Sequence, residues 1–213
     1  MRGQNHKFMI SKEENILLAA EELFATKGFN GTSTREIAKE ARVNVSMISY
    51  YFGSKEKLFE QLFQFRMNES LAFSKEIITN DSLNEWEKLN AIITRYIFRV
   101  KTLKNFYLIL QREQLTNKNP KILQNINESK KGFLRIYEQL INSGFDDKIF
   151  TNKPRLELIH ATISGTIFTG INTFSLYKEF SDGDENFETQ YFEDLNIHIK
   201  NLLKYLLGYE QNI

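Results

Sequence analysis

The segment Ser33–Leu58, STREIAKEARVNVSMISYYFGSKEKL, contains the start signals of three successive helices. Ser33 and Glu36 match the S-x-x-E pattern of a capping box, in which each side chain accepts a hydrogen bond from the other residue's backbone N–H. Asn44 is a favourable N-cap for a second helix of about two turns, and Ser54 for a third. Helices as short as the first two are unstable alone, so the pattern predicts a module of packed helices.

The second helix, about residues 45–51, has an outward face of small and aromatic side chains without an acid. These side chains are Ser46, Met47, Ser49 and Tyr50. Two short helices joined by a tight turn are typical of a helix-turn-helix, and the DNA major groove admits one helix. The helix N-termini at Ser33 and Ser54 offer backbone N–H groups and a positive dipole end to phosphates. The alternative is a generic three-helix module without a role in DNA binding.

A longer series of residues agrees in order, and without a gap, with the signature of a known family. The series comprises Gly28-Phe29, Thr32-Ser33-Thr34, Ile37-Ala38, Ala41, Val43-Asn44, Ile48, Tyr51-Phe52, Ser54-Lys55-Glu56 and Leu58. On these residues the segment from Ile10 to Leu62 resembles the TetR family of bacterial transcription regulators. Two positions depart from the family pattern. Arg42 stands where the family usually has a turn glycine, and Ser49 where an aromatic residue is common.

The resemblance and the exposed helix face together predict a set of DNA contacts. Thr34 and Arg35 are expected to position the module on phosphates. Tyr51 and Lys55 are expected to clamp the DNA backbone. The residues expected at base edges are Ser46, Met47 and Tyr50, with Met47 meeting thymine methyl groups. The full candidate set is Ser33, Thr34, Arg35, Asn44, Val45, Ser46, Met47, Ser49, Tyr50, Tyr51 and Lys55.

The composition is that of an ordinary globular chain, and it does not by itself indicate a nucleic-acid partner. The 213 residues carry a formal net charge of +1. Six basic residues surround the motif, and three glutamates dilute them, so we expect a modest positive patch rather than a basic domain. These nine residues are Lys27, Arg35, Lys39, Arg42, Lys55 and Lys57 with Glu36, Glu40 and Glu56. The absence of cysteine excludes disulfides, and no apolar leader or membrane-spanning run is visible, which predicts a cytoplasmic protein.

The pattern along the whole chain predicts an all-α fold of about nine helices. We expect a three-helix helix-turn-helix domain at residues 1–56 and a helical ligand-binding and dimerisation domain at 57–213. A capping box at Ser82 is expected to open one helix, and Pro120 to occupy the first position of another. Gly144 is expected to end that helix, and Gly208 to close the last one. One helix is expected to run from Pro154 to about residue 177.

The last two long helices are candidates for a dimer interface. Small residues at four-residue spacing let another helix approach closely, and the final helix has an apolar stripe. The resemblance implies that these helices pair with their symmetry mates in a four-helix bundle, although the stripe alone would equally suit an intramolecular core. The candidate residues are Ala161, Gly165, Thr169, Leu195, Ile199, Leu202 and Leu206. A two-fold dimer would place two reading helices roughly 34 Å apart and predicts a near-palindromic operator.

The middle helices are rich in aromatic residues, with a few polar ones among them. The resemblance implies a ligand pocket there, and the aromatic residues favour a flat or greasy organic ligand. The candidates are Trp86, Tyr96, Tyr107, Gln111, Phe133, Tyr137, His160 and Phe168. For any single aromatic, plain core packing is the more usual role, and His160 is more often a core histidine than a ligand contact. For Arg112 the options are an anionic ligand or a local acid such as Glu113.

Enzyme chemistry has no support in the sequence. The three histidines, His6, His160 and His198, are far apart and lack metal-ligand spacing, and no nucleophile elbow, P-loop or dinucleotide fingerprint is present. We therefore expect no catalytic residues, no metal and no cofactor. The leading hypothesis is a dimeric repressor released from its operator by a small organic ligand. The alternatives are a DNA-binding regulator without an inducer and a helical protein-interaction module.

Overall fold

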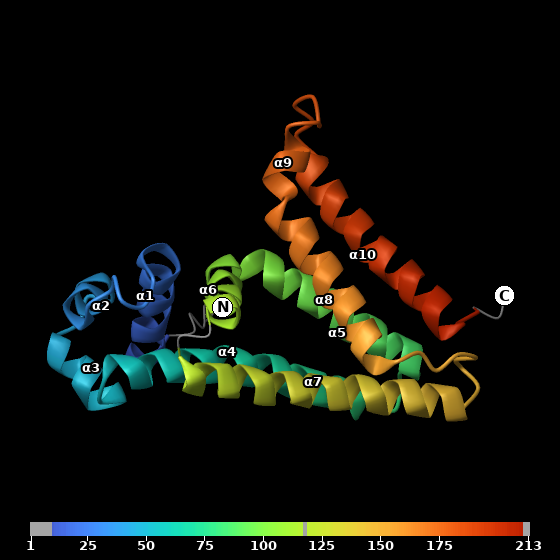
Figure 1. The fold of residues 1–213 in the computed structure, drawn as a ribbon, viewed down its shortest axis with the longest axis horizontal. Coiled ribbons are helices and arrows are strands. Elements are labelled where there is room, and N and C mark those ends of the chain that lie inside the picture. The colour runs from blue at the N-terminus through green and yellow to red at the C-terminus, as the bar shows by residue number, and fades with distance from the viewer. Residues whose placement is uncertain (1–9, 117–118, 211–213) are drawn as a thin grey trace, which may run out of the picture. The chain divides into compact units, whose positions relative to one another are not determined.

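The structure is a computed structural model that describes residues 10–116 and 119–210. Within these residues the secondary structure consists of ten α-helices and contains no strand (Figure 1). The prediction of an all-α fold is therefore confirmed. The helices form two compact units, one made of the described residues through Asn68 with Asn105–Ile126, and one of Glu69–Lys104 with the described residues from Asn127 onward.

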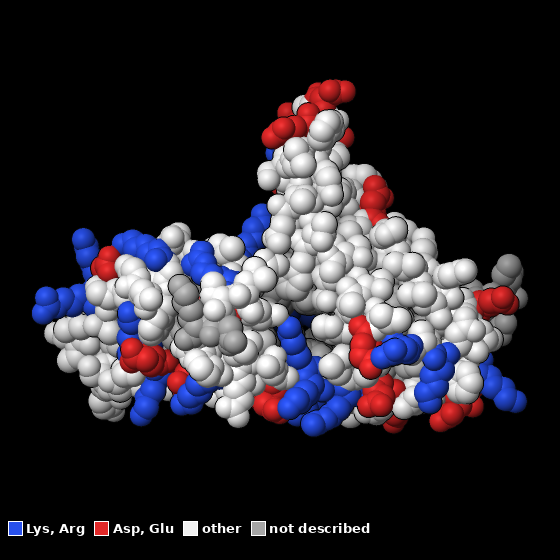
Figure 2. All heavy atoms as spheres, in the orientation of Figure 1, with Lys and Arg blue, Asp and Glu red and all other residues white. Residues whose placement is uncertain are grey.

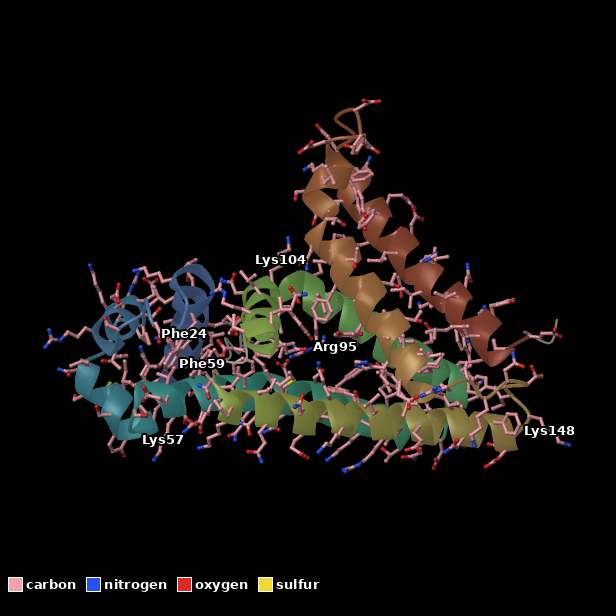
Figure 3. The ribbon with its side chains drawn as sticks, viewed as in Figure 1. Phe24, Lys57, Phe59, Arg95, Lys104 and Lys148 are labelled. Carbon is pink, nitrogen blue, oxygen red and sulfur yellow. The ribbon has the colours of Figure 1, made fainter. Side chains whose placement is uncertain are left out.

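The first unit contains the helix-turn-helix segment. Its helices are α1 (Lys12–Lys27), α2 (Thr34–Glu40), α3 (Val45–Phe52), the first part of α4 (Lys55–Ile78), α6 (Lys104–Thr116) and the start of α7 (Pro120–Asp146). A chain of aromatic rings forms its core. Phe24 of α1 meets Phe59 of α4 with ring centroids 4.8 Å apart (Figure 3), and Phe63 meets Phe106 of α6 at 5.5 Å. These four rings are almost completely buried, so apolar contact ties α1 to α4 and α6.

The second unit is built on α5 (Glu85–Thr102), α8 (Leu156–Asn172), the short α9 (Phe174–Lys178) and α10 (Phe187–Leu207), with the remaining parts of α4 and α7. Helices α8 and α10 lie side by side (Figure 1). Their facing sides carry buried aliphatic residues at helical spacing, which also pack on α5. These are Ile159, Ile163 and Ile167 of α8 and Leu195, Ile199, Leu203 and Leu207 of α10.

Most helix boundaries lie where the capping residues predict them. Capping boxes form at Ser11 with Glu14 and at Ser33 with Glu36. Helix α7 begins at Pro120, and Gly208 ends α10 with a left-handed φ of 63°. No helix in the described part of the chain is long and apolar enough to cross a membrane.

Three boundary predictions are wrong. Asn84, not Ser82, is the N-cap of α5, because its side chain forms the capping box with Glu87. Gly144 lies inside α7 rather than at its end, and a Cβ there would overlap the ring of Phe150, so this glycine permits a close approach. The helix expected from Pro154 to residue 177 is two helices, α8 and α9, which raises the count from nine to ten.

Candidate DNA interface and effector region

Helix α3 is fixed by one face and exposes the other. Ile48 and Phe52, four residues apart, are buried in the first unit. Ser46, Ser49 and Tyr50 are exposed, and the Tyr50 side chain is 82 % accessible. Because residues three to four apart share a helix face, the anchoring of Ile48 and Phe52 directs this set outward. Of the residues predicted to read base edges, Ser46 and Tyr50 lie on this exposed surface and Met47 is half-buried.

The turn between α2 and α3 contains a residue in an unfavourable backbone conformation. Arg42 has a φ of 55°, in the left-handed region that glycine adopts readily. Hydrogen bonds on both sides hold the turn. Asn15 Nδ2 of α1 donates to the Ala41 carbonyl at 2.7 Å, and the Val43 N–H donates to the Ala38 carbonyl at 2.9 Å. The angle between α2 and α3 is therefore set by contacts to α1 as well as by the turn itself.

The N-terminus of α2 carries an ion pair. Lys27 Nζ lies 2.7 Å from Glu36 Oε1, while Glu36 Oε2 accepts from both the Ser33 N–H and the Ser33 hydroxyl at 2.8 Å. The hydrogen bond from Lys27 and those from Ser33 lower the pKa of Glu36 from 4.5 to about 2. Thr34 is half-buried beside this pair, and Arg35 is exposed. Figure 2 shows basic side chains over this part of the molecule with acidic ones among them, as the sequence predicts.

Asn44 acts as the N-cap of α3. Its Oδ1 accepts from the Ser46 N–H at 2.9 Å and from the Ser46 hydroxyl at 2.8 Å. Because the Ser46 hydroxyl donates its proton to Asn44, its lone pairs remain the groups with which it can meet a base amino group. Val45 is exposed and Met47 half-buried on the same helix.

Lys55 makes structural contacts that its sequence pattern does not predict. Its ammonium donates to the carbonyls of Phe29 and Thr32, both at 2.9 Å, and lies 4.2 Å from the centre of the Phe29 ring. An ammonium has three donors, so only one remains for a phosphate. Tyr51 is half-buried, with its ring packed edge-on against Tyr50 at 5.1 Å. Lys55 therefore anchors α4 to the loop after α1, and the predicted phosphate contact would use its remaining N–H.

Arg112 of α6 also takes a role that was not predicted. Its Nη1 donates to the Phe24 carbonyl and its Nη2 to the Ala25 carbonyl, each at 3.1 Å. These carbonyls belong to the C-terminal part of α1, where a positive charge is favourable. The interpretation of Arg112 as a ligand for an anion or a partner of a local acid is therefore replaced by a link from α6 to α1. A buried ion pair from Arg66 of α4 to Glu21, with Nε–Oε2 at 2.7 Å, makes a second link to α1.

The residues proposed for ligand binding are divided between the two units. Tyr107, which is buried, and Gln111, which is half-buried, belong to the first unit, and the other six belong to the second. The six are Trp86, Tyr96, Phe133, Tyr137, His160 and Phe168. Tyr96 and Phe168 form an edge-on pair with ring centroids 6.3 Å apart.

The surroundings of two of these residues, Trp86 and His160, are well defined. Trp86 is buried with its ring stacked on Tyr209, with ring centroids 4.8 Å apart, and its predicted ligand contact stays a prediction. His160 is half-buried on α8. Burial and then the positive charge of Lys130 lower the pKa of His160, and burial lowers the pKa of Lys130.

The residues proposed for the dimer interface differ in exposure. Ala161, Gly165 and Thr169 form an exposed row on α8, and nothing lies within 4 Å of a Cβ placed on Gly165. Leu195 and Ile199 are buried inside their own chain against α8, so their assignment to a dimer surface is corrected. Leu202 and Leu206 are half-buried. The large apolar side chains that α10 exposes are Ile197 and Tyr205.

Within the described residues, no group of three or more His, Asp or Glu side chains has the arrangement of a metal site. His160 and His198 lie on α8 and α10 without such neighbours, and His6 falls outside the described residues.

Comparison with known proteins accounts for both parts of the chain. Residues 16–62 match the model described as bacterial regulatory proteins, tetR family. Residues 63–180 match the model described as YsiA-like protein, C-terminal region, which extends the match over more than half of the chain. The chain belongs to the TetR family. It is therefore a DNA-binding transcription regulator and not an enzyme.

Three matches, one to a curated protein and two to solved structures, cover most of this TetR-family chain. The fatty acid metabolism regulator protein of Bacillus subtilis is 28% identical over 174 residues, 82% of this chain and 86% of that protein. The crystal structure of FadR from Bacillus subtilis in complex with stearoyl-CoA covers 92% of this chain and 98% of that one, with 25% identity and a TM-score of 0.69. The fatty acid degradation regulator FadR from Bacillus halodurans has the same fold, with 23% identity, coverage of 93% and 99%, and a TM-score of 0.68.

Proposed function

We propose that this regulator is a homodimeric repressor that leaves a near-palindromic operator when a fatty acyl-CoA binds. In this proposal residues 1–56 read DNA, and residues 57–213 bind the effector and the second protomer. The observation that supports the effector class is the likeness, over almost the whole chain, to a FadR described in complex with stearoyl-CoA. An apolar acyl chain also suits the aromatic residues of the middle helices. The phosphates of CoA suit the basic residues of α5.

The exposed face of α3 supports the proposed DNA contacts. The Ser46 hydroxyl and the Tyr50 ring point away from the core, where they can meet base edges in a major groove. Thr34 and Arg35 lie at the N-terminus of α2, whose N–H groups favour a phosphate. Tyr51 supplies a phosphate contact at the other end of α3, and Lys55 adds its one remaining N–H.

The dimer is proposed to form through the exposed faces of α8 and α10. Ala161, Gly165 and Thr169 leave the backbone of α8 open to close approach by another helix. Ile197 and Tyr205, which are 53 % and 80 % exposed, supply apolar surface on α10. Two-fold pairing would repeat the α3 reading face twice, which is why the operator is expected to be near-palindromic.

Release from DNA requires only that the effector bind one conformation better than another. An acyl-CoA that prefers the conformation with low DNA affinity reduces operator binding by the ratio of its two affinities. Helix α4 is the element through which we expect the change to pass, because it starts at the DNA-reading head with Lys55 and continues into the second unit.

The first experiment is selection from a random DNA library with the purified protein, followed by fluorescence anisotropy of the enriched sequence across a salt series. We expect a near-palindrome whose affinity falls as salt rises, because phosphate contacts release counterions. Stearoyl-CoA is then titrated into the complex, with octanoyl-CoA and free CoA for comparison. Release by stearoyl-CoA supports the proposal. An enriched operator that no acyl-CoA releases would favour a regulator without this inducer.

Variants of the reading face separate base contacts from phosphate contacts. Ser46→Ala and Tyr50→Ala are expected to change which bases are enriched, because these side chains face base edges. Tyr51→Phe is expected to weaken binding about equally on all sequences. Repeating the selection with each variant measures this. An unchanged operator for both Ser46→Ala and Tyr50→Ala would place the base contacts elsewhere.

A further inference from the structure

Two arginines of α5 share one carboxylate in the second unit. Arg99 Nη1 lies 2.9 Å from Glu69 Oε2, and Arg95 Nη2 lies 3.7 Å from Glu69 Oε1. Arg95 and Arg99 are four residues apart, so both guanidinium groups lie on one face of α5. Glu69 is on α4. The cluster therefore joins α5 to α4 through charge.

The carboxylate is the most exposed member of this cluster, and the Arg95 side chain is 35 % exposed. The Arg99 side chain is only 3 % exposed, whereas that of Glu69 is 44 % exposed. A guanidinium keeps its charge in a protein, so a buried one needs an anion beside it. The Glu69 carboxylate supplies this anion. Because its side chain is exposed to solvent, another anion can compete with it for the arginines.

Arg95 is held in position by aromatic rings. Its guanidinium carbon lies 5.4 Å from the centre of Phe73 of α4 and 5.5 Å from that of Phe98 of α5 (Arg95 is labelled in Figure 3). Contacts of this kind attract the cation to the ring faces and limit the conformations of its long side chain. The Nε atom of Arg95 is buried and makes no hydrogen bond. A second anion oxygen would give this N–H a partner.

We propose that Arg95 and Arg99 form a binding site for an anionic group of the effector, which the Glu69 carboxylate occupies in the free protein. A carboxylate or phosphate fits the two-pronged guanidinium geometry and displaces Glu69 toward solvent. This site would bind one group of the effector proposed above. The inference rests on that proposed function for the identity of the rest of the ligand. Displacement would detach α4 from its ion pairs with α5, which gives ligand binding a direct effect on the helix that begins at Lys55.

The site is tested first with a probe that needs no acyl chain. Inorganic pyrophosphate is titrated at constant ionic strength against the wild type, Glu69→Gln and the double variant Glu69→Gln/Arg95→Gln, with thermal unfolding as the readout. We expect Glu69→Gln to bind pyrophosphate about tenfold more tightly than the wild type, because the competing charge is gone, and the double variant to lose that gain. Glu193→Gln removes the same charge from an exposed position of α10 and should leave binding unchanged.

The second arm uses organic ligands and Arg95→Gln alone, which decides the proposal if Glu69→Gln does not fold. Stearoyl-CoA, stearate, free CoA and octadecanol are compared by direct binding. We expect at least about tenfold weaker binding of the anionic ligand that occupies the site, and no change for octadecanol. Weaker binding of stearate assigns the site to a carboxylate, and weaker binding of CoA and its thioester assigns it to a phosphate. Arg135→Gln, an exposed position of α7, is the control.

The outcomes separate this inference from the proposed function. Equal pyrophosphate and ligand binding by the wild type and the cluster variants would overturn the anion site, even if stearoyl-CoA releases DNA. Variant-dependent pyrophosphate binding without any effect of acyl-CoA would support the anion site and overturn the effector class.

Discussion

At the residue scale, Arg42 adopts an unfavourable left-handed backbone conformation in the turn between α2 and α3, which lowers the stability of the DNA-reading module. A non-glycine residue at a φ of 55° has its Cβ close to backbone atoms. The hydrogen bonds from Asn15 and Val43 hold the turn in this conformation although Arg42 disfavours it.

Two substitutions at Arg42 separate the free energy of backbone strain from the loss of the side chain. Arg42→Gly should be more stable than Arg42→Ala by about 1 kcal/mol, because both remove the same side chain and only glycine relieves the left-handed strain. Urea denaturation of the two variants measures the difference in unfolding free energy. Arg42→Ala serves as the matched control for loss of charge. Equal stabilities would show that the turn is unstrained.

Glu36 is a second residue whose local contacts have a measurable consequence. The hydrogen bonds from Lys27 and Ser33 lower its pKa from 4.5 to about 2 in the folded protein. A carboxyl with a lowered folded pKa stabilises the fold above its unfolded pKa, and this contribution disappears as the pH falls from 4.5 toward 2.

We therefore expect Glu36→Gln to be less stable than the wild type at pH 7 and equally stable near pH 2. The free energy of unfolding, measured in urea at several pH values, checks this. Glu40→Gln, which removes a carboxylate from an exposed position at the end of the same helix, is the control for the loss of a titrating charge. A difference between Glu36→Gln and the wild type that is constant with pH would contradict the assignment.

At the element scale, the C-terminal part of α1 is held by a helix far along the chain. Arg112 of α6 donates to the carbonyls of Phe24 and Ala25, and the rings of Phe24, Phe59 and Phe63 bring α1, α4 and α6 together. The orientation of α1 matters for DNA reading, because its Asn15 also holds the α2–α3 turn.

Replacement of Arg112 should loosen this element. We expect Arg112→Gln to reduce the unfolding free energy by about 1–2 kcal/mol, since two charge-assisted hydrogen bonds to a helix end are lost from a part-buried site. Arg112→Lys should lie between Arg112→Gln and the wild type, because an ammonium reaches one carbonyl but lacks the two-pronged geometry. Thermal and urea denaturation measure the series, with Arg135→Gln as the exposed control. An Arg112→Gln protein as stable as the wild type would show that the link contributes nothing.

At the scale of the whole molecule, the proposed function requires a second protomer. The row Ala161, Gly165 and Thr169 is exposed in a single chain, and Gly165 has open space where a Cβ would point. A large side chain there leaves the protomer intact and blocks close approach of another helix.

Gly165→Arg is therefore expected to convert a dimer to a monomer without a large loss of helix content. Sedimentation velocity and circular dichroism measure both properties. The monomer should bind the palindromic operator at least about tenfold more weakly, because only one half-site is read at a time. Gln139→Arg, an exposed position on α7, is the control. A dimeric Gly165→Arg protein would move the interface away from this row.

Much of the fold followed from short-range rules. The capping box at Ser33, the N-cap Asn44 and the closing Gly208 each act within a few residues, so the sequence predicts them correctly. Where two signals competed within a few residues, as with Ser82 and Asn84, the sequence could not rank them, because packing of the following helix chooses the register.

By itself, the sequence determined the helical class, the helix-turn-helix with its outward face on α3, and the family of the chain, since these depend on local spacing. Only the tertiary structure decided which partner each long side chain takes. Arg112 lies 88 residues from the Phe24 carbonyl it binds, Lys55 reaches back to Thr32, and Ile199 faces its own core rather than solvent. Such contacts depend on how distant segments pack, and a hydrophobic or charged pattern on one helix does not specify the element that will cover it.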